Sequence, residues 1–461
     1  MRRGQGRRPG RSARPVGRRA AVPALLVAAL VSGCTSHTES GDSRLPQAES
    51  WSSVTGGPAN PGRAHAPVSD EPELLWSRTL GAPLSGVASS DGIGTTYQAT
   101  ISERGCNLFA LTSEDGRKRW CSRLPTEGPR ITATVDGRGY TFIPQYGGVG
   151  ALAPEGEMRW FQPIQGIPTT ITLLDNRTLL MISHLGIARA VNAHTGLDAS
   201  AATPLAGEIA ASDPAFGVVW CATGERGCPV PGPAAVDTAS GTFYLTAWRP
   251  GRAVPELVAA RFNPGGRGHF EVLWRTELPD GRLGTPVVLS DDGTEVYAHA
   301  ADGTLHGYAT DDGAVRWSAP LGYEPDTPPA LLPDGTLVAG GRTTTIWRGR
   351  SDEHADDAGP APVVAIRGED GRGHEVWRRD DLRQLTNPVA TENGRVVVAV
   401  RSDAGEGDEP GVAVHLLDGG DGHTVHSFVV PAATGPVSGL SVDADGRIAV
   451  STAMGAVYVY G

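Results

Sequence analysis

Residues 284–321 read GTPVVLSDDGTEVYAHAADGTLHGYATDDGAVRWSAPL. This stretch contains four short apolar or alternating runs, which are separated by Asp-Gly turns at 292–293, 302–303 and 312–313. Such runs with tight Asp-Gly turns are typical of antiparallel strands joined by hairpins. A single four-stranded sheet leaves apolar side chains uncovered, so we expect further copies of the unit to stack against it.

Two marks repeat along the chain at intervals of about 40 to 50 residues, which is typical of propeller blades. A small residue followed by proline opens a unit, where proline removes no ladder hydrogen bond. A tryptophan falls on the expected fourth strand. We expect these tryptophans to fill the space between neighbouring sheets, with the indole N–H bonded to the backbone, rather than to stack on a sugar. They are Trp76, Trp120, Trp160, Trp274, Trp317 and Trp377.

The sequence therefore predicts an all-β fold, an eight-bladed β-propeller of four-stranded antiparallel blades over residues 71–461. Seven blades are the alternative, because the third and fourth units are irregular. Residues 73–80 read as the fourth strand of a blade whose other strands are the last runs of the chain, from 437 to 460. Pairing of the two chain ends would close the ring and remove its open edges.

The first 33 residues differ from the rest of the chain. Eight arginines and no acid precede an apolar run at 20–31. This run is too short to span a membrane as a helix and is typical of a signal peptide. The following Val31-Ser32-Gly33-Cys34 resembles the lipobox of bacterial lipoproteins, in which the cysteine is lipidated and becomes the mature N-terminus. We expect a signal peptide at 1–33, a lipid anchor on Cys34 at the extracytoplasmic face of the cell membrane, and a flexible tether at 34–70.

Charge and composition limit the classes of partner. Removal of the eight arginines would change the net charge of −11 to −19, so nucleic acid is not an expected partner. Lysine occurs once, as Lys118, beside 39 arginines, and Ala, Gly and Pro are abundant. This usage indicates a GC-rich genome and resembles that of an actinomycete.

Four of the five cysteines remain after Cys34, and they form two close pairs. Cys106 and Cys121 flank the expected hairpin 107–120 at nearly equal distances from its turn, which places them opposite one another on two strands. Cys221 and Cys228 enclose a short loop. No histidine stands near either pair at ligand spacing, so two disulfides are favoured over a metal site or free thiols.

Residues 108–120, LFALTSEDGRKRW, resemble the repeat of PQQ-type propellers, which reads approximately L-Y-A-L-D-x-x-T-G-x-x-x-W. Residues 305–317 and 363–377 are looser copies, and the resemblance covers about 70–461. The superfamily includes quinoprotein dehydrogenases, BamB-like lipoproteins that scaffold outer-membrane assembly, and extracytoplasmic domains of receptor kinases. The lipobox and eight units most resemble the BamB-like branch. An actinomycete is not expected to contain that Gram-negative assembly machinery, so the partner stays open.

Motifs for chemistry are weak. Quinoprotein dehydrogenases that resemble this fold carry two adjacent cysteines, which this sequence lacks, so we expect no PQQ cofactor. His374-Glu375 is not followed by the second histidine of a zincin. Residues 443–446 lack the remainder of a calcium loop and read as a hairpin turn. His299 and His306, on neighbouring strands, read as solvated sheet residues, and no metal site is expected.

We therefore expect a non-catalytic lipoprotein whose propeller binds or scaffolds another protein or polymer of the cell envelope. The alternative is an envelope enzyme or sensor that binds a PQQ-like quinone, a metal or a sugar in the central channel. Acidic insertions at 350–360 and 402–410 interrupt consecutive blades and are candidates for partner contact. Their candidate residues are Asp352, Glu353, Asp356, Asp357, Glu406, Asp408 and Glu409.

Overall fold

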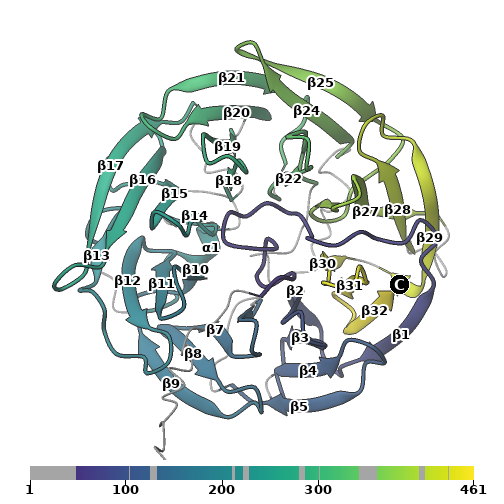
Figure 1. Ribbon diagram of the computed structural model, residues 1–461, viewed down its shortest axis with the longest axis horizontal. Helices are drawn as coiled ribbons and strands as arrows, with labels where there is room; N and C mark the ends of the chain where they lie inside the picture. Colours follow the sequence, from purple (N-terminus) through teal and green to yellow (C-terminus); the bar gives the residue numbers. More distant parts are fainter. Residues whose placement is uncertain are drawn as a thin grey trace, which may run out of the picture. The chain divides into compact units, whose positions relative to one another are not determined.

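The computed structural model describes residues 48–102, 104–124, 132–209, 213–221, 228–279, 286–300, 302–325, 327–341, 361–403, 411–434 and 436–461. All of them belong to the compact unit Arg44–Gly461. Over these residues the chain forms eight four-stranded antiparallel sheets, arranged as blades around a common axis (Figure 1). None of the described helices has the length and apolar character needed to cross a membrane.

Strands run in chain order from the axis to the rim in the first four blades. Blade 1 contains β2 (Leu84–Ser90), β3 (Thr95–Thr100), β4 (Leu108–Thr112) and β5 (Lys118–Ser122). Blade 2 contains β6 (Thr134–Val135), β7 (Thr141–Gln145), β8 (Gly148–Leu152) and β9 (Met158–Pro163). Blade 3 contains β10 (Pro168–Leu173), β11 (Thr178–Ser183), β12 (Ile187–Asn192) and β13 (Thr203–Pro204). After the short helix α1 (Val218–Cys221), blade 4 contains β14 (Ala235–Asp237), β15 (Thr242–Ala247), β16 (Glu256–Asn263) and β17 (His269–Glu277).

Blades 5 to 7 have the same strand order as the first four, whereas blade 8 takes its outer strand from the other end of the chain. Blade 5 contains β18 (Val288–Leu289), β19 (Glu295–His299), β20 (Thr304–Ala309) and β21 (Val315–Pro320). Blade 6 contains β22 (Ala330–Leu331), β23 (Leu337–Val338), β24 (Val363–Glu369) and β25 (Arg372–Arg379). Blade 7 contains β26 (Val389–Ala390), β27 (Arg395–Ser402), β28 (Gly411–Asp418) and β29 (Thr424–Thr434). Blade 8 contains β30 (Val437–Val442), β31 (Ile448–Thr452), β32 (Ala456–Tyr460) and β1 (Leu74–Thr79).

Blade 5 shows why the sequence forms these elements. Its three turns contain Gly293, Gly303 and Gly313 with φ of 68°, 77° and 72°, a left-handed conformation that glycine adopts at little steric cost. Side chains then alternate between the two faces of the sheet, so that Val296 packs towards blade 4 and Tyr297 towards blade 6. The predicted eight-bladed propeller is confirmed, and the seven-bladed alternative is not.

The predicted closure of the ring is also confirmed. Strand β1 pairs antiparallel with β32, with Ser77 opposite Tyr458. Beyond these strands, Glu73 and Gly461 exchange two backbone hydrogen bonds of 3.0 Å each. The first strand of the chain thus covers the edge that the last blade would otherwise expose.

Hydrophobic cores lie between neighbouring blades. One core joins Tyr97 and Leu108 of blade 1 to Ile143 and Leu152 of blade 2, all at most 2% exposed. Full burial of such a side chain contributes roughly 1.5–3 kcal/mol. Blade-to-blade contact therefore supplies the burial that a lone sheet lacks.

Candidate functional site

The described part of the expected tether packs against the blades. We call residues 48–70 the axial segment, because they run through the centre of the ring (Figure 1). Trp51 is only 1% exposed and belongs to a core that includes residues of blades 7 and 8. The expectation for 34–70 is therefore wrong for 48–70, since these residues bury apolar surface and bond to the blades.

The axial segment completes the hydrogen bonding of the inner strands. An inner strand has a neighbour on one side only, so its N–H groups on the axial side need partners. Among the described residues, the last or next-to-last residue of the inner strand donates to a carbonyl of the axial segment in six blades. These bonds are Ser90 to Trp51 (2.8 Å), Val135 to Ser52 (2.9 Å), Val236 to Pro58 (2.8 Å), Leu289 to Ala59 (3.0 Å), Leu331 to Pro61 (2.8 Å) and Ala390 to Gly62 (2.9 Å). We call this end of the ring, where inner strands end, the base.

Two side chains fix the axial segment over blades 4 to 6. The Arg63 guanidinium makes two contacts of 2.8 Å with the Asp291 carboxylate. The Asn60 amide donates to the carbonyls of Pro233 (3.2 Å) and Val287 (3.0 Å). The Asp291 side chain is 52% exposed, but the Arg63 side chain is only 10% exposed, so solvent screens the ion pair only in part.

The predicted blade-packing tryptophans lie at the seams between blades. Five of them donate the indole N–H to a backbone carbonyl of the next blade. These bonds are Trp76 to Ser113 (2.9 Å), Trp120 to Pro154 (2.6 Å), Trp160 to Ala193 (3.1 Å), Trp274 to Thr310 (2.9 Å) and Trp377 to Gly419 (2.7 Å). Trp317 differs, because its indole donates to the Glu295 carboxylate of its own blade at 3.1 Å.

In each of these five cases, the indole ring packs against a turn glycine of the next blade. A Cβ built on Gly116 would lie 2.5 Å from the Trp76 ring, and Gly116 has a φ of 66°. The same relationship joins Trp120 to Gly156, Trp160 to Gly196, Trp274 to Gly313 and Trp377 to Gly422. The spacing of turn glycine and tryptophan in the sequence is thus a packing device rather than a sugar-stacking platform.

Both expected cysteine pairs are bonded. Cys106 and Cys121 are 5.7 Å apart at Cα and tie the connection before β4 to β5. Cys221 and Cys228 are 4.9 Å apart at Cα and tie the end of α1 to the segment that leads into blade 4.

The sequence suggested that His299 and His306 are solvated, and this prediction is wrong. The two residues are 1% and 8% exposed. The register pairs His299 with Leu305 and His306 with Ala298, so the two imidazoles leave opposite faces of the sheet. Burial, assisted by the charge of His306, lowers the pKa of His299 to about 3, and burial also lowers the pKa of His306. His306 Nδ1 lies 2.7 Å from the Ser318 hydroxyl. Both histidines are therefore neutral core residues at physiological pH.

The carboxylate of Asp443 forms the hairpin turn between β30 and β31. One oxygen accepts the backbone N–H groups of Asp445 and Arg447, both at 2.9 Å, and the other pairs with the Arg447 guanidinium at 3.1 Å. Burial raises the pKa of Asp443, and these hydrogen bonds oppose the shift. Residues 443–446 thus form a hairpin turn, as the sequence indicated.

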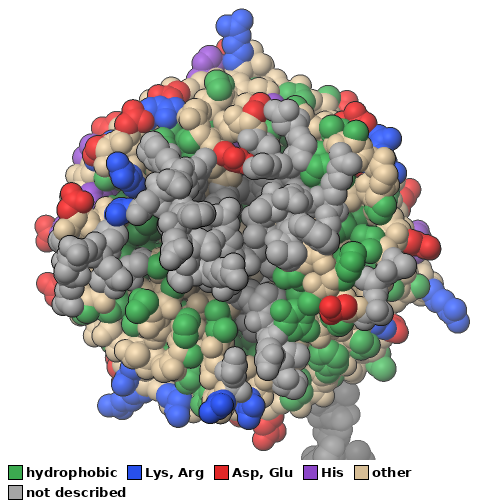
Figure 2. Space-filling view, turned by 180° about the vertical axis from the view of Figure 1, so that it is seen from behind, with side chains coloured by type: hydrophobic (Ala, Val, Ile, Leu, Met, Phe, Trp, Pro, Cys, Tyr) green, Lys and Arg blue, Asp and Glu red, His purple; other side chains and the backbone are tan. Residues whose placement is uncertain are grey.

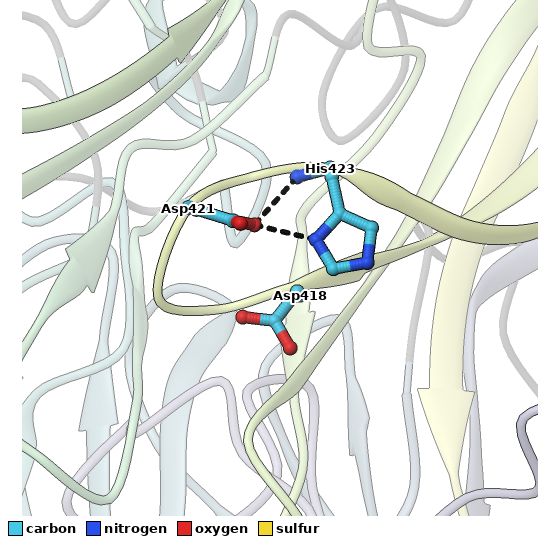
Figure 3. A group of neighbouring side chains, drawn as sticks. All are labelled: Asp418, Asp421 and His423. Atoms are coloured by element: carbon cyan, nitrogen blue, oxygen red, sulfur yellow. Dashed lines mark hydrogen bonds and ion pairs between the residues drawn. The ribbon is translucent and has the colours of Figure 1, made fainter.

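Among the described residues, the ligand atoms of Asp418, Asp421 and His423 lie within 4.8 Å of one another (Figure 3). The Asp418 carboxylate forms an ion pair with Arg395 at 2.6 Å. Arg395 also pairs with Asp70 of the axial segment at 2.8 Å. One Asp421 oxygen accepts the backbone N–H of His423 at 3.0 Å and lies 2.6 Å from His423 Nδ1. These groups fold the turn between β28 and β29 and join it to the axial segment.

A buried ion-pair cluster in blade 4 escaped sequence reasoning. Glu256 is 2% exposed and makes two contacts of 2.6 Å with Arg249, and Arg275 and Arg252 each lie 3.5 Å away. Burial alone would raise the pKa of Glu256, but the Arg249 guanidinium, with Arg275 and Arg252, lowers it. The cluster fixes the connection between β15 and β16, at the end of the ring opposite the base. These charged residues lie far apart over 249–275, and only the fold brings them together.

Several predicted sites lie outside the described residues. They are Cys34 and the acidic residues Asp352, Glu353, Asp356, Asp357, Glu406, Asp408 and Glu409. Lipidation and partner contact at these positions stay predictions.

Figure 2 views the ring from behind Figure 1, and charged side chains gather along its rim there. Exposed apolar side chains also occur at the end opposite the base. Ile101 is 43% exposed and Met454 is 66% exposed. Ile101 donates its N–H to the Pro83 carbonyl at 2.8 Å, and Gly455 accepts from Leu80 at 2.8 Å. We call Ile101 and Met454 the seam patch, because both flank the connection from blade 8 to blade 1.

Comparison with solved structures supports the architecture. The europium-containing methanol dehydrogenase has a TM-score of 0.60 at 14% identity and covers 89% of this chain and 98% of its own. BamB from Moraxella catarrhalis has a TM-score of 0.54 at 17% identity and covers 85% of this chain and 97% of its own. At these identities the likeness concerns the fold alone.

Sequence comparison places the fold in a family. The family model described as outer membrane protein assembly factor BamB matches residues 205–372. The chain belongs to the BamB-like, PQQ-type β-propeller family, as its repeats indicated. A relative over nearly the whole length is protein Rv3035 of Mycobacterium tuberculosis, which is 30% identical over 418 residues, or 90% of this chain and 96% of the relative.

Proposed function

We propose that this protein is a lipoprotein, anchored through Cys34 at the extracytoplasmic face of the cell membrane, whose propeller is a non-catalytic binding platform for another protein or polymer of the envelope. The observation that carries the proposal is the axial segment. It occupies the inner edge of the ring at the base, so that a partner meets the end opposite the base.

The chemistry of the buried groups supports binding rather than turnover. Glu256 is neutralised by arginines, Asp443 forms a turn, and His306 bonds to Ser318. Each of these ionisable groups is used in folding. A catalytic acid or base would instead need a proton acceptor or donor within reach of a substrate.

The end opposite the base is fixed in place before a partner binds. The Cys106–Cys121 disulfide and the Glu256 cluster constrain connections there. Constrained connections lose less conformational entropy on association, so a surface of this kind binds with a smaller ordering cost. The seam patch adds exposed apolar area that a partner can cover.

Photocrosslinking in the envelope of the producing cell tests the platform. A photoreactive residue is placed at Ile101 or Met454, and at Leu197 as a control, because Leu197 is 69% exposed and apolar but lies in the turn after β12. We expect one discrete crosslinked species from the seam patch and none from Leu197. Equal capture from all three positions would contradict the assignment of the surface. Quinone-dependent dehydrogenase activity of the purified protein would contradict the non-catalytic function.

A further inference from the structure

We propose that the base of the ring is a peptide-binding site, that the axial segment is its ligand bound in cis, and that the same site takes peptides of matching sequence in trans. The proposal goes beyond the platform, because it concerns the opposite end of the ring and does not depend on it. The ligand class is a peptide rich in glycine and proline that forms turns, as residues 53–59 do, with one tryptophan and one arginine as anchors.

The inner strands of the ring bind the backbone of the ligand through hydrogen bonds. The six inward-directed N–H groups at the base meet six different carbonyls of the axial segment, those of residues 51, 52, 58, 59, 61 and 62, at 2.8–3.0 Å. Ala64 adds a bond in the other direction, from its N–H to the Ala390 carbonyl at 2.9 Å. Main-chain bonds of this kind supply affinity without regard to side chains, as in peptides added to a sheet edge.

Two side chains supply the selectivity. Trp51 is buried among core residues such as Val389 and Val442. Arg63 crosses to Asp291 with two contacts of 2.8 Å and leaves only 10% of its side chain exposed. Buried tryptophan and arginine are the residue types that most often dominate the binding energy of an interface.

The path of the ligand demands particular residues between the anchors. Gly56, Asn60 and Gly62 have φ of 88°, 57° and 57°. A Cβ on Gly62 would also lie 3.0 Å from Ala330 Cα, so a side chain there meets the ring. The site therefore selects a peptide with Asn-Pro-Gly-Arg nine residues after a tryptophan, as at positions 60–63 and 51.

The covalent link between ligand and ring is short and accessible. Residues Glu71 and Glu73 are exposed between the axial segment and β1. A protease site inserted between Glu71 and Pro72 of the full chain lets the segment be cut after the protein has folded. Variants that fail to fold are thereby avoided.

Exchange in the cut protein is the test. A fluorescent synthetic peptide of residues 48–71 is added in excess, and its binding is followed by fluorescence anisotropy. We expect the labelled peptide to replace the cut segment. The Arg63→Ala peptide should bind about tenfold or more weakly, because a charged partner of Asp291 is lost. The His65→Ala peptide is the matched control and should bind as the parent does, since His65 is exposed.

A second measurement ties the peptide to its site. Asp291→Asn in the cut protein should weaken the parent peptide but add little to the loss from Arg63→Ala, because both changes remove the same ion pair. Three outcomes would overturn the proposal. They are absence of exchange over hours, unfolding of the ring on cutting as seen by circular dichroism, and equal binding of the parent and Arg63→Ala peptides.

Discussion

The indole N–H of Trp76 donates to the carbonyl oxygen of Ser113 over 2.9 Å. Trp76 lies on β1, the strand that closes the ring by pairing with β32, and Ser113 lies in blade 1. The closing strand is therefore held on two sides. Its backbone bonds to the last strand of the chain, and its largest side chain bonds to the first complete blade.

Gly116→Ala should destabilise the protein more than Gly293→Ala. Both glycines have positive φ, at 66° and 68°, so both substitutions carry the same backbone strain of about 1 kcal/mol. Only at Gly116 does the new Cβ collide with Trp76, whereas a Cβ on Gly293 meets nothing within 4 Å. We expect a further loss of about 1–3 kcal/mol for Gly116→Ala, measured by urea unfolding. Equal losses would contradict the role of the seam.

Loss of the Cys106–Cys121 disulfide should cost more than loss of the Cys221–Cys228 disulfide. The bonded residues are 15 and 7 positions apart, and the longer loop restricts the unfolded chain more. Serine at both positions of the first pair should lower the free energy of unfolding by about 3 kcal/mol on this model. Unreduced peptide mapping checks the pairing, and free thiols at these positions would contradict it.

Asp136 should make stability fall as pH rises through mildly acidic values. One carboxylate oxygen accepts the N–H groups of Arg138 and Tyr140, and the other has no hydrogen-bond partner among the described residues. Burial raises the pKa of Asp136 to about 6, although those hydrogen bonds oppose the shift. The folded state then binds more protons than the unfolded state between pH 3.8 and about 6, so stability decreases over this window, by up to about 3 kcal/mol.

Asp136→Asn is the variant that tests this dependence, because the amide keeps one acceptor oxygen and cannot ionise. Unfolding in urea at several pH values should show a flatter profile for the variant between pH 4 and about 6. An unchanged slope would mean that other groups cause the decline.

Cys34→Ala should abolish lipid attachment. Cells fed an alkyne-labelled fatty acid should incorporate label into the parent protein and not into the variant, which should leave the membrane fraction. Label that persists in the variant would contradict Cys34 as the acceptor.

Serine in place of the seven acidic residues at 352–357 and 406–409 should weaken partner capture and leave the melting temperature nearly unchanged, because a surface charge acts on association more than on folding. Capture is measured by crosslinking from Met454. Replacement of exposed Asp311 and Asp312 by Ser gives a control with altered charge elsewhere. Undiminished capture would remove the acidic insertions from the contact region.

The blades were predictable because their determinants are local. A turn glycine and a tryptophan four to six residues later stand close in the sequence, and they specify both a hairpin and the seam that the next blade completes. The pairing of 73–80 with the chain end followed from a count of strands, since one blade lacked an edge. Cysteine spacing indicated both disulfides for the same local reason.

The axial segment was not predictable in this way. It is rich in Ala, Ser, Gly and Pro and contains one tryptophan, and a composition rich in small residues also describes a linker. Its bonds reach Val236, Leu289 and Ala390, residues far away in the sequence, and the donors are backbone groups that no side-chain pattern reveals. Trp51 was the one available signal, since a large aromatic residue in a polar stretch needs a place to bury. The Glu256 cluster was missed because Arg249 and Arg252 come from the connection before β16, whereas Arg275 lies on β17.

The path of the axial segment also constrains how such chains can change over evolutionary time. The turns that follow the inner strands are short, and the segment lies one hydrogen bond away from the strand ends. An added residue in one of these turns would disturb the bond of that blade to the segment, which also bonds to five other blades. We therefore expect length changes to be tolerated at the connections between blades rather than in the turns at the base.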